Sequence, residues 1–216
     1  MSSYFEFLSD NRSTLLFDSY QHLSYVVQSL LIGLVLGVAA AVLCYRSVRW
    51  TGTANAGSAM AMTLPGFAAF GLLSGVMGPG VNPAVIVLVF YGMMPILRNT
   101  VVGLRGVDPA LVESAKGMGM SRSATLLRLE IPMAWPVIMT GVRVSAQMMM
   151  GVAAIAAYVS GPGLGGQIFQ GLSQLGGVNA TERVVVATVL IIILAIILDL
   201  VLGLIARLTT SRGIRV

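Results

Sequence analysis

The sequence is poor in charge and in cysteine. Only 10% of its 216 residues are charged and 56% are hydrophobic, whereas a soluble domain carries about 25% charged residues. The mean hydropathy is +0.90. The single cysteine, Cys44, excludes a disulfide framework or a cysteine-based metal cluster within one chain. The first residues lack the basic stretch and apolar core of a cleavable signal peptide, so we expect none.

Signals of catalysis, cofactor binding and nucleic-acid binding are also missing. The run GPGLGG at 161–166 is not followed by the Gly-Lys-Ser/Thr of a phosphate loop. The single histidine, His22, has no metal-ligand partner at a suitable spacing, and we expect it at the membrane interface. The net charge of +5 is not gathered in a basic patch with interleaved aromatics. We therefore expect no enzyme activity, metal or cofactor on this chain, and no nucleic-acid partner.

Long apolar runs are what the sequence does contain. A spanning helix needs about 20 predominantly apolar residues, and five stretches approach or meet this length: Leu23–Tyr45, Ala54–Met77, Val81–Leu97, Trp135–Val159 and Val184–Ala206. Small residues recur within them, such as Gly33 with Gly37, and Ala54 with Gly57 and Ala61. Such positions let helix backbones approach closely in a membrane. The sequence predicts an all-α integral membrane protein with about five transmembrane helices.

The basic residues are segregated along the chain. If the N-terminus lies outside, ten of them fall on the inner side and only Arg12 and Arg183 on the outer side. Loops rich in lysine and arginine stay in the cytoplasm. The distribution therefore predicts an outer N-terminus and an inner C-terminus.

We divide the chain into three parts. Residues 1–22 form an outer segment in which aromatic and apolar residues alternate with polar ones, either a helix lying on the membrane surface or a loosely ordered leader. Residues 23–208 form the transmembrane domain, and residues 209–216 a cytoplasmic tail. The glycine-rich loop at 160–182 is expected to be partly re-entrant or to lie against the outer mouth of the bundle.

A long inner loop, residues 98–131, joins the third and fourth spans. Loops of this length are uncommon unless they are functional. Asp108 followed by Pro109 predicts a helix start, with a capping carboxylate and a proline in the first turn. Gly119 ends this helix, and Ser121 can cap a second one. The loop is predicted to be a helix–turn–helix on the inner surface.

The loop resembles a signature of the membrane subunits of bacterial ABC importers, which reads Glu-Ala-Ala, three residues, Gly, nine residues, Ile-x-Leu-Pro. This sequence has Glu113-Ser114-Ala115, Gly119 and Leu129-Glu130-Ile131-Pro132 at that spacing, with conservative departures at positions 114, 129 and 131. The resemblance implies the type I ABC importer permease fold and a coupling helix seated in a cleft of an ATPase. It implies a polar contact from Glu113, close packing by Ala115 and a turn at Gly119. The implied coupling residues are Glu113, Ser114, Ala115, Gly119, Ile131 and Pro132.

The resemblance extends over residues 21–208. The runs YGMMPILRNTVVGLRGVDPALVESAKGMGMSR and YVSGPGLGGQIFQGL look like the glycine betaine, carnitine and choline (osmoprotectant) branch of these permeases. So do QHLSYVVQSLLIGLVLGV and IILDLVLGLIARL. The alternative within the family is a methionine importer permease. The rivals from other classes are a secondary transporter or channel subunit, and a membrane scaffold without transport.

The resemblance also implies partners and a location. They are an ABC ATPase that carries ATP and magnesium, a second permease copy or paralogue, and a periplasmic or lipid-anchored solute-binding protein. The chain is expected as a multi-pass protein of the bacterial cytoplasmic (inner) membrane, with no fused solute-binding domain. Solute selectivity is expected to reside mainly in the separate binding protein.

Two charges fall inside predicted spans. Arg143 lies about 13 Å into the fourth span and Asp199 about 11 Å from the inner end of the fifth, by helical rise. A charge within the membrane costs several kcal/mol unless it is paired or hydrated. Because the two helices run in opposite directions, we predict an Arg143–Asp199 contact. It is either a static pair or a strut that shifts between conformations.

The sequence indicates the residues of a substrate path less clearly than it indicates the coupling loop and the ion pair. Aromatic faces attract quaternary ammonium groups through cation–π interactions. Tyr91 and Tyr158 lie near the ends of apolar runs, and Met148 belongs to an adaptable Met-Met-Met run. An interfacial aromatic belt explains the tyrosines as well as a path does.

Overall fold

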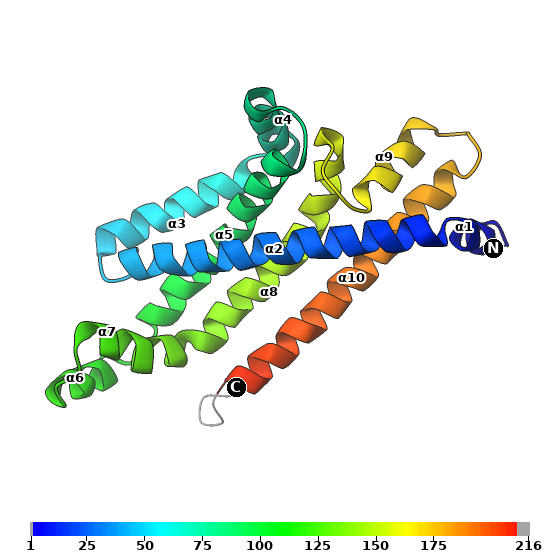
Figure 1. The fold of residues 1–216 in the computed structure, drawn as a ribbon. Helices are drawn as coiled ribbons and strands as arrows, with labels where there is room; N and C mark the ends of the chain where they lie inside the picture. The colour runs from blue at the N-terminus through cyan, green and yellow to red at the C-terminus, as the bar shows by residue number, and fades with distance from the viewer. Residues whose placement is uncertain (1, 211–216) are drawn as a thin grey trace.

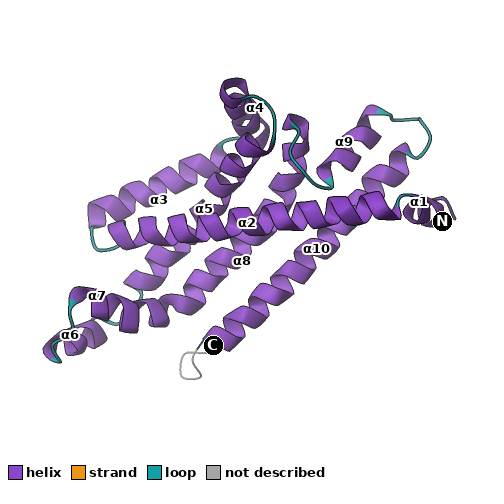
Figure 2. Ribbon diagram, viewed as in Figure 1, coloured by secondary structure: helices purple, strands orange, loops and turns teal. Residues whose placement is uncertain are grey.

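The computed structural model describes residues 2–210, and that part of the chain is built of helices without strands (Figure 2). The elements are α1 (Ser2–Asp10), α2 (Arg12–Cys44), α3 (Val48–Thr63), α4 (Gly66–Met77), α5 (Val81–Arg105), α6 (Pro109–Gly117), α7 (Arg122–Thr125), a π-helical turn (Leu126–Glu130), α8 (Ile131–Ile155), a 3₁₀ turn (Ala156–Val159), α9 (Gly165–Ser173) and α10 (Ala180–Thr209). Figure 1 shows α1, α4 and α9 toward one end of the bundle, and α6 and α7 at the other.

Among the described residues, four helical stretches are long and apolar enough to cross a membrane on their own: α2, α5, the stretch Arg122–Val159 that contains α8, and α10. They correspond to the first, third, fourth and fifth predicted spans. The third predicted span is extended at its inner end, because α5 continues to Arg105 and has 25 residues. Helix α2 begins at Arg12 and runs through residue 22 without a break. The division of the chain at residue 22 stays a prediction.

The second predicted span is not one straight helix. It is divided into α3 and α4, which meet at an angle of 90°. Leu64 precedes Pro65 and has an extended backbone, as the proline ring requires of the residue before it. The Tyr91 hydroxyl donates to the Leu64 carbonyl, which the bend leaves without a helical partner. The pair counts as one broken span at most, so the part of the chain that the structure describes has four or five candidate spans.

Helix α5 lies at the centre of the bundle, between α2 and α8. Small residues allow this packing. A Cβ added at Gly37 would lie 3.0 Å from the Met93 carbonyl oxygen on α5, and one at Gly141 would lie 2.7 Å from the Asn99 Cβ. The close approach predicted at Gly37 is thus present, whereas Gly57 on α3 has no neighbour within 4 Å of such a Cβ.

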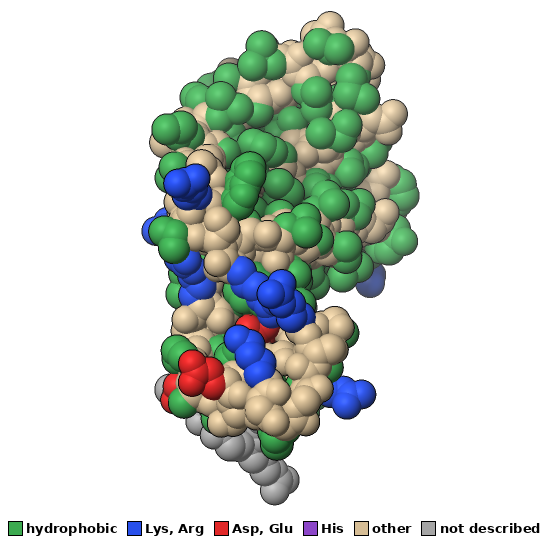
Figure 3. All heavy atoms as spheres, turned by 90° about the vertical axis from the view of Figure 1, so that its left-hand side faces the viewer, with side chains coloured by type: hydrophobic (Ala, Val, Ile, Leu, Met, Phe, Trp, Pro, Cys, Tyr) green, Lys and Arg blue, Asp and Glu red, His purple; other side chains and the backbone are tan. Residues whose placement is uncertain are grey.

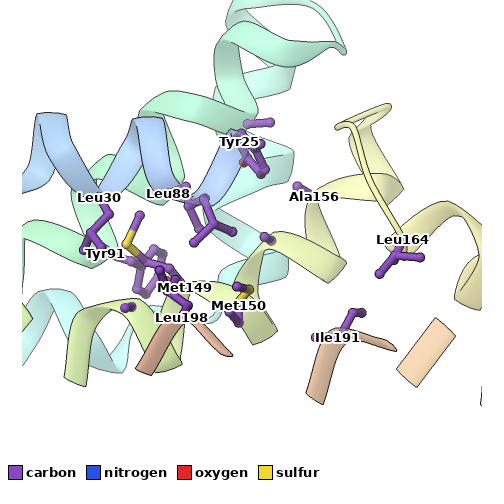
Figure 4. Packing of buried hydrophobic residues seen from close by; sticks show 14 of the residues in the cluster. Tyr25, Leu30, Leu88, Tyr91, Met149, Met150, Ala156, Leu164, Ile191 and Leu198 are labelled. Carbon is purple, nitrogen blue, oxygen red and sulfur yellow. The ribbon is translucent and has the colours of Figure 1, made fainter. Parts of the chain in front are cut away.

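The buried core joins residues from α2, α5, α8 and α10 (Figure 4). Leu88, Tyr91 and Met149 are among its buried side chains. A Cβ added at Gly92 would lie 2.3 Å from the Met149 sulfur, so the thioether fills the space that the glycine leaves. Burial of this kind fixes the relative positions of the helices that carry the charged groups described below.

The outer end is covered by α1 and α9. Phe7 of α1 is buried, and α1 packs against α10. Gln167 of α9 donates to Asp18 at 2.8 Å, and its side-chain oxygen accepts from Arg183 at 2.8 Å. The glycine-rich outer loop therefore lies across the ends of α2 and α10, in keeping with the expectation that it covers the outer mouth. The surface-helix interpretation of residues 1–22 stays a prediction.

Candidate functional site

The inner loop folds as the predicted helix–turn–helix. An Asp108 carboxylate oxygen accepts from the Ala110 amide at 2.8 Å, with Pro109 in the first turn of α6. Gly119 has a φ of +84°, a conformation that side chains other than glycine rarely adopt, and it turns the chain after α6. The Ser121 hydroxyl accepts from the Ala124 amide at 3.3 Å and caps α7. Both predicted caps are confirmed.

Helix α6 projects beyond the ends of the long helices (Figure 1). Glu113 and Ser114 are exposed on it, and the Ser114 hydroxyl donates to the Ala110 carbonyl of its own helix at 2.8 Å. Ala115 is only 2% exposed, so its small side chain packs inside the loop. Its part in the contact with an ATPase stays a prediction. Glu113 remains available to a partner.

Basic side chains surround this end of the molecule. Figure 3 shows lysine and arginine side chains gathered over the lower half of one face, whereas the upper half is mostly hydrophobic. The projecting loop and the ends of the long helices lie in this lower half. The surface therefore agrees with the charge segregation that predicted which end is cytoplasmic.

A polar cluster of Tyr45, Arg46 and Glu130, which we call the inner clamp, joins the loop to the end of α2. Glu130 lies in the π-helical turn immediately before α8 and is 5% exposed. Its carboxylate accepts from the Tyr45 hydroxyl at 2.7 Å and from Arg46 Nη2 at 3.2 Å. Arg46 Nε also donates to the Tyr45 hydroxyl oxygen, at 2.5 Å. π-Helical turns occur frequently at functional sites.

The inner clamp also reaches α5. Arg105, the last residue of that helix, donates from Nε to the Tyr45 backbone carbonyl at 3.0 Å. Burial, assisted by the Glu130 carboxylate, raises the pKa of Tyr45 to about 12, so its hydroxyl is a stable donor at neutral pH. The sequence analysis missed this cluster. The available signal was a carboxylate, Glu130, placed directly at the start of an apolar span.

The two charges inside the membrane meet. Arg143 Nε donates to Asp199 Oδ1 at 2.8 Å, and Nη2 donates to Oδ2 at 2.7 Å. Gln147 lies one turn further along α8. Because α8 begins at Ile131 and α10 ends at Thr209, the pair lies about 15–18 Å from the inner ends of its helices.

A cavity of about 840 Å³ opens beside this ion pair, between α8 and α10. Its lining includes Arg143, Asp199 and Thr140, with Gly203 beneath the guanidinium and Arg207 nearer the inner end. The cavity brings together the polar groups that the sequence placed inside the spans.

The other candidates for the substrate path have different surroundings. Tyr91 is 5% exposed, and its hydroxyl donates to the Leu64 carbonyl at the α3–α4 bend, so its place in a substrate path stays a prediction. Met148 is half-buried against the core. Tyr158 is 64% exposed, and its ring packs with Phe67 and Phe169 at centroid distances of 5.3 and 6.1 Å.

The last residue singled out in the sequence is His22, the single histidine of the chain. His22 is fully buried, and its Nε2 lies 3.2 Å from the Met150 carbonyl oxygen. The expectation of an interfacial histidine is therefore wrong. Within residues 2–210, no three histidine, cysteine, aspartate or glutamate side chains are grouped as metal ligands.

Comparison with known proteins identifies relatives along most of the chain. The family described as "Binding-protein-dependent transport system inner membrane component" matches residues 33–211. The choline transport system permease protein OpuBB of Bacillus subtilis is 37% identical, over 78% of this chain and 77% of that protein. The carnitine transport permease protein OpuCB of Listeria monocytogenes is 35% identical, over 80% and 79%. The osmoprotectant import permease protein OsmW of Salmonella typhimurium is 37% identical, over 77% and 80%.

Solved structures agree on the fold. A structure of the MetNI methionine ABC transporter matches with a TM-score of 0.79 at 21% identity, over 91% of this chain and 96% of the other. A structure of an amino acid ABC transporter matches with a TM-score of 0.72 at 21% identity, over 93% and 97%. Likeness at this level of identity concerns the arrangement of helices.

Proposed function

The chain belongs to the family of binding-protein-dependent transport system inner membrane components, and from this premise we propose that it is the permease subunit of an ATP-driven osmoprotectant importer. It is a transport component of the bacterial inner membrane and not an enzyme. The solute is glycine betaine, carnitine, choline or a related quaternary amine, because relatives that match over about four fifths of this chain are named for these compounds.

The observation that carries this proposal is the projecting loop. It presents an exposed Glu113 on a short capped helix, and the inner clamp fastens the following turn to α2 and α5. A rigid element fixed to several spanning helices transmits a push from a neighbouring protein to all of them at once. A soluble ATPase seated on α6 would use it in this way. ATP and magnesium would be bound by that subunit.

A second permease copy or a paralogue completes the path. Only 22% of the most apolar 18-residue stretch of α10 is buried within this chain. Nothing in the chain lies within 4 Å of a Cβ built at Gly57 on α3. Two-fold association is the common arrangement among soluble oligomers, and it would let two such chains enclose one passage. A separate periplasmic or lipid-anchored binding protein would deliver the solute at the outer end, beside α4 and α9.

Reconstitution tests the proposal. The permease is assembled with its ATPase in proteoliposomes, and uptake of labelled glycine betaine, carnitine and choline is measured with the binding protein outside and ATP inside. The proposal predicts ATP-dependent uptake of at least one of the three. Uptake of none, or uptake that an ion gradient drives without ATP, would contradict it.

The Glu113→Arg variant separates this proposal from the secondary-transporter rival. A bulky cation on the exposed face of α6 is expected to abolish ATP-coupled uptake, because it places the wrong charge and volume in the docking contact. Lys116→Gln, on the same helix and also exposed, is the matched control. Full activity of Glu113→Arg would favour a transporter that needs no ATPase.

A further inference from the structure

The cavity beside the Arg143–Asp199 pair must contain water or a polar group. The side chains of Arg143 and Asp199 are 42% and 22% exposed, respectively, although they lie well inside the span. Lipid-facing charges are rare at such depth because their burial in hydrocarbon is costly. Thr140 and Gln147 are exposed on the same face of α8, three and four residues from Arg143. This face is therefore suited to a water-filled path.

The ion pair leaves part of its binding capacity unused. Arg143 contacts Asp199 through Nε and Nη2, which form one edge of the guanidinium. A guanidinium has a second edge, between its two Nη atoms, that can bind another carboxylate through two parallel hydrogen bonds. Gly203 has no side chain to cover the guanidinium, and a Cβ built there would lie 3.8 Å from Arg143 Cζ.

Glycine betaine and carnitine fit this arrangement because they are zwitterions. Each carries a carboxylate and a trimethylammonium group, which has no N–H and interacts only through its charge and its methyl groups. A carboxylate on the free edge of Arg143 would lie beside the guanidinium, with the ammonium group further out in the cavity. Opposite charges would then alternate around the site, and no net charge would be added to the membrane. Choline has no carboxylate for Arg143.

We propose that this cavity is a transient subsite for the zwitterionic solute on its way through the permease. Arg143 binds the carboxylate, and Asp199 holds the guanidinium in place. The inference rests on the proposed function and adds to it. The permease itself, and not only the binding protein, favours zwitterionic solutes over choline. The Arg143–Asp199 bond stays closed and orients the free edge of the guanidinium for the solute.

Two other roles for the pair predict different behaviour. A static pair that holds α8 to α10 would affect every solute equally. A site for a lipid phosphate group would make activity depend on anionic lipid and not on the carboxylate of the solute. The test therefore compares solutes within one protein.

Uptake of glycine betaine and choline is measured for the complete importer in proteoliposomes, with Arg143→Lys and with the double variant Arg143→Met/Asp199→Leu. Replacing a buried pair by apolar residues of similar volume is often neutral for folding. The double variant should lower kcat/KM for betaine on the order of tenfold or more, since a bidentate contact to a charge is lost. Choline uptake should fall less than about threefold.

Arg143→Lys keeps the positive charge but removes the planar guanidinium, which can form two parallel hydrogen bonds to a carboxylate. It should raise the KM for betaine and leave that for choline unchanged, a difference that a purely structural pair would not produce. Val144→Thr is the matched control, because Val144 is 45% exposed on the same helix and is not part of the cavity lining. If the importer takes betaine only, uptake is compared with ATPase activity stimulated by betaine-loaded binding protein. On our inference the double variant loses uptake more than it loses stimulation.

Equal loss for both solutes, no loss for either, or loss that anionic lipid restores would overturn the inference. So would a wild-type importer that takes choline and no zwitterion, although the proposed function would then stand. A wild-type importer that takes no quaternary amine refutes the proposed function itself.

Discussion

Removing the Glu130 carboxylate should loosen the coupling loop from the transmembrane helices. In Glu130→Ala, the buried Tyr45 hydroxyl loses the acceptor that now lies 2.7 Å away. A hydrogen bond to a charged group contributes about 1.5–3 kcal/mol. The contact with Arg46 adds about 0–1 kcal/mol, because that side chain is 45% exposed and solvent screens it. The expected loss of stability is about 2–4 kcal/mol.

The assay is thermal unfolding of the purified protein combined with coupled uptake. For a chain of this size, 1 kcal/mol shifts Tm by about 2–4 °C, so Glu130→Ala should lower Tm by roughly 4–16 °C. Uptake per ATP hydrolysed should fall as well, because the loop no longer moves with α2. Glu130→Gln should lose less, since the amide oxygen still accepts from Tyr45.

Leu127→Ala is the matched control for the inner clamp. It truncates a side chain that is 65% exposed in the same π-helical turn and should change neither Tm nor coupling. If Glu130→Ala behaves like Leu127→Ala in both measurements, the inner clamp does not connect the loop to the helices.

Three further predictions concern packing, the turn and pH. Gly141→Ala should lower Tm because its Cβ meets α5, whereas Gly57→Ala should leave Tm unchanged or raise it, as expected for an open helical site. Gly119→Val should destabilise the loop by about 1–2 kcal/mol, since valine disfavours a φ of +84°, and should reduce ATPase binding in a pull-down. Tyr45 ionises near pH 10 when unfolded but only near pH 12 when folded, so chemical denaturation should show wild-type stability falling between these values. Tyr45→Phe should show a smaller fall.

Much of the fold was predictable because lipid imposes simple rules. Apolar length located the helices, and charge segregation gave the orientation. The caps at Asp108 and Ser121 depend on residues close in sequence, so local reasoning found them. The depths of Arg143 and Asp199 followed from helical rise, which is why their contact could be anticipated.

The features that sequence reasoning missed depend on contacts between distant segments. Nothing local marks Tyr45 as the partner of Glu130, which is 85 residues away. The bend after α3 was missed because Pro65 lies in an otherwise uninterrupted apolar run, and the length of that run predicted a single straight helix. His22 appeared interfacial by position, but the carbonyl of Met150 accommodates it inside the bundle. Tyr91 likewise binds a backbone group that only the fold brings near.

The central claim is that α6 docks on an ATPase. A photo-crosslinking amino acid at position 113 of the assembled importer tests it most directly, with position 175 in the outer loop as the control, where Leu175 is 71% exposed. The account predicts a crosslink from position 113 to the ATPase subunit and none to that subunit from position 175. A crosslink to the ATPase from position 175, or none from position 113 in an active complex, would contradict it.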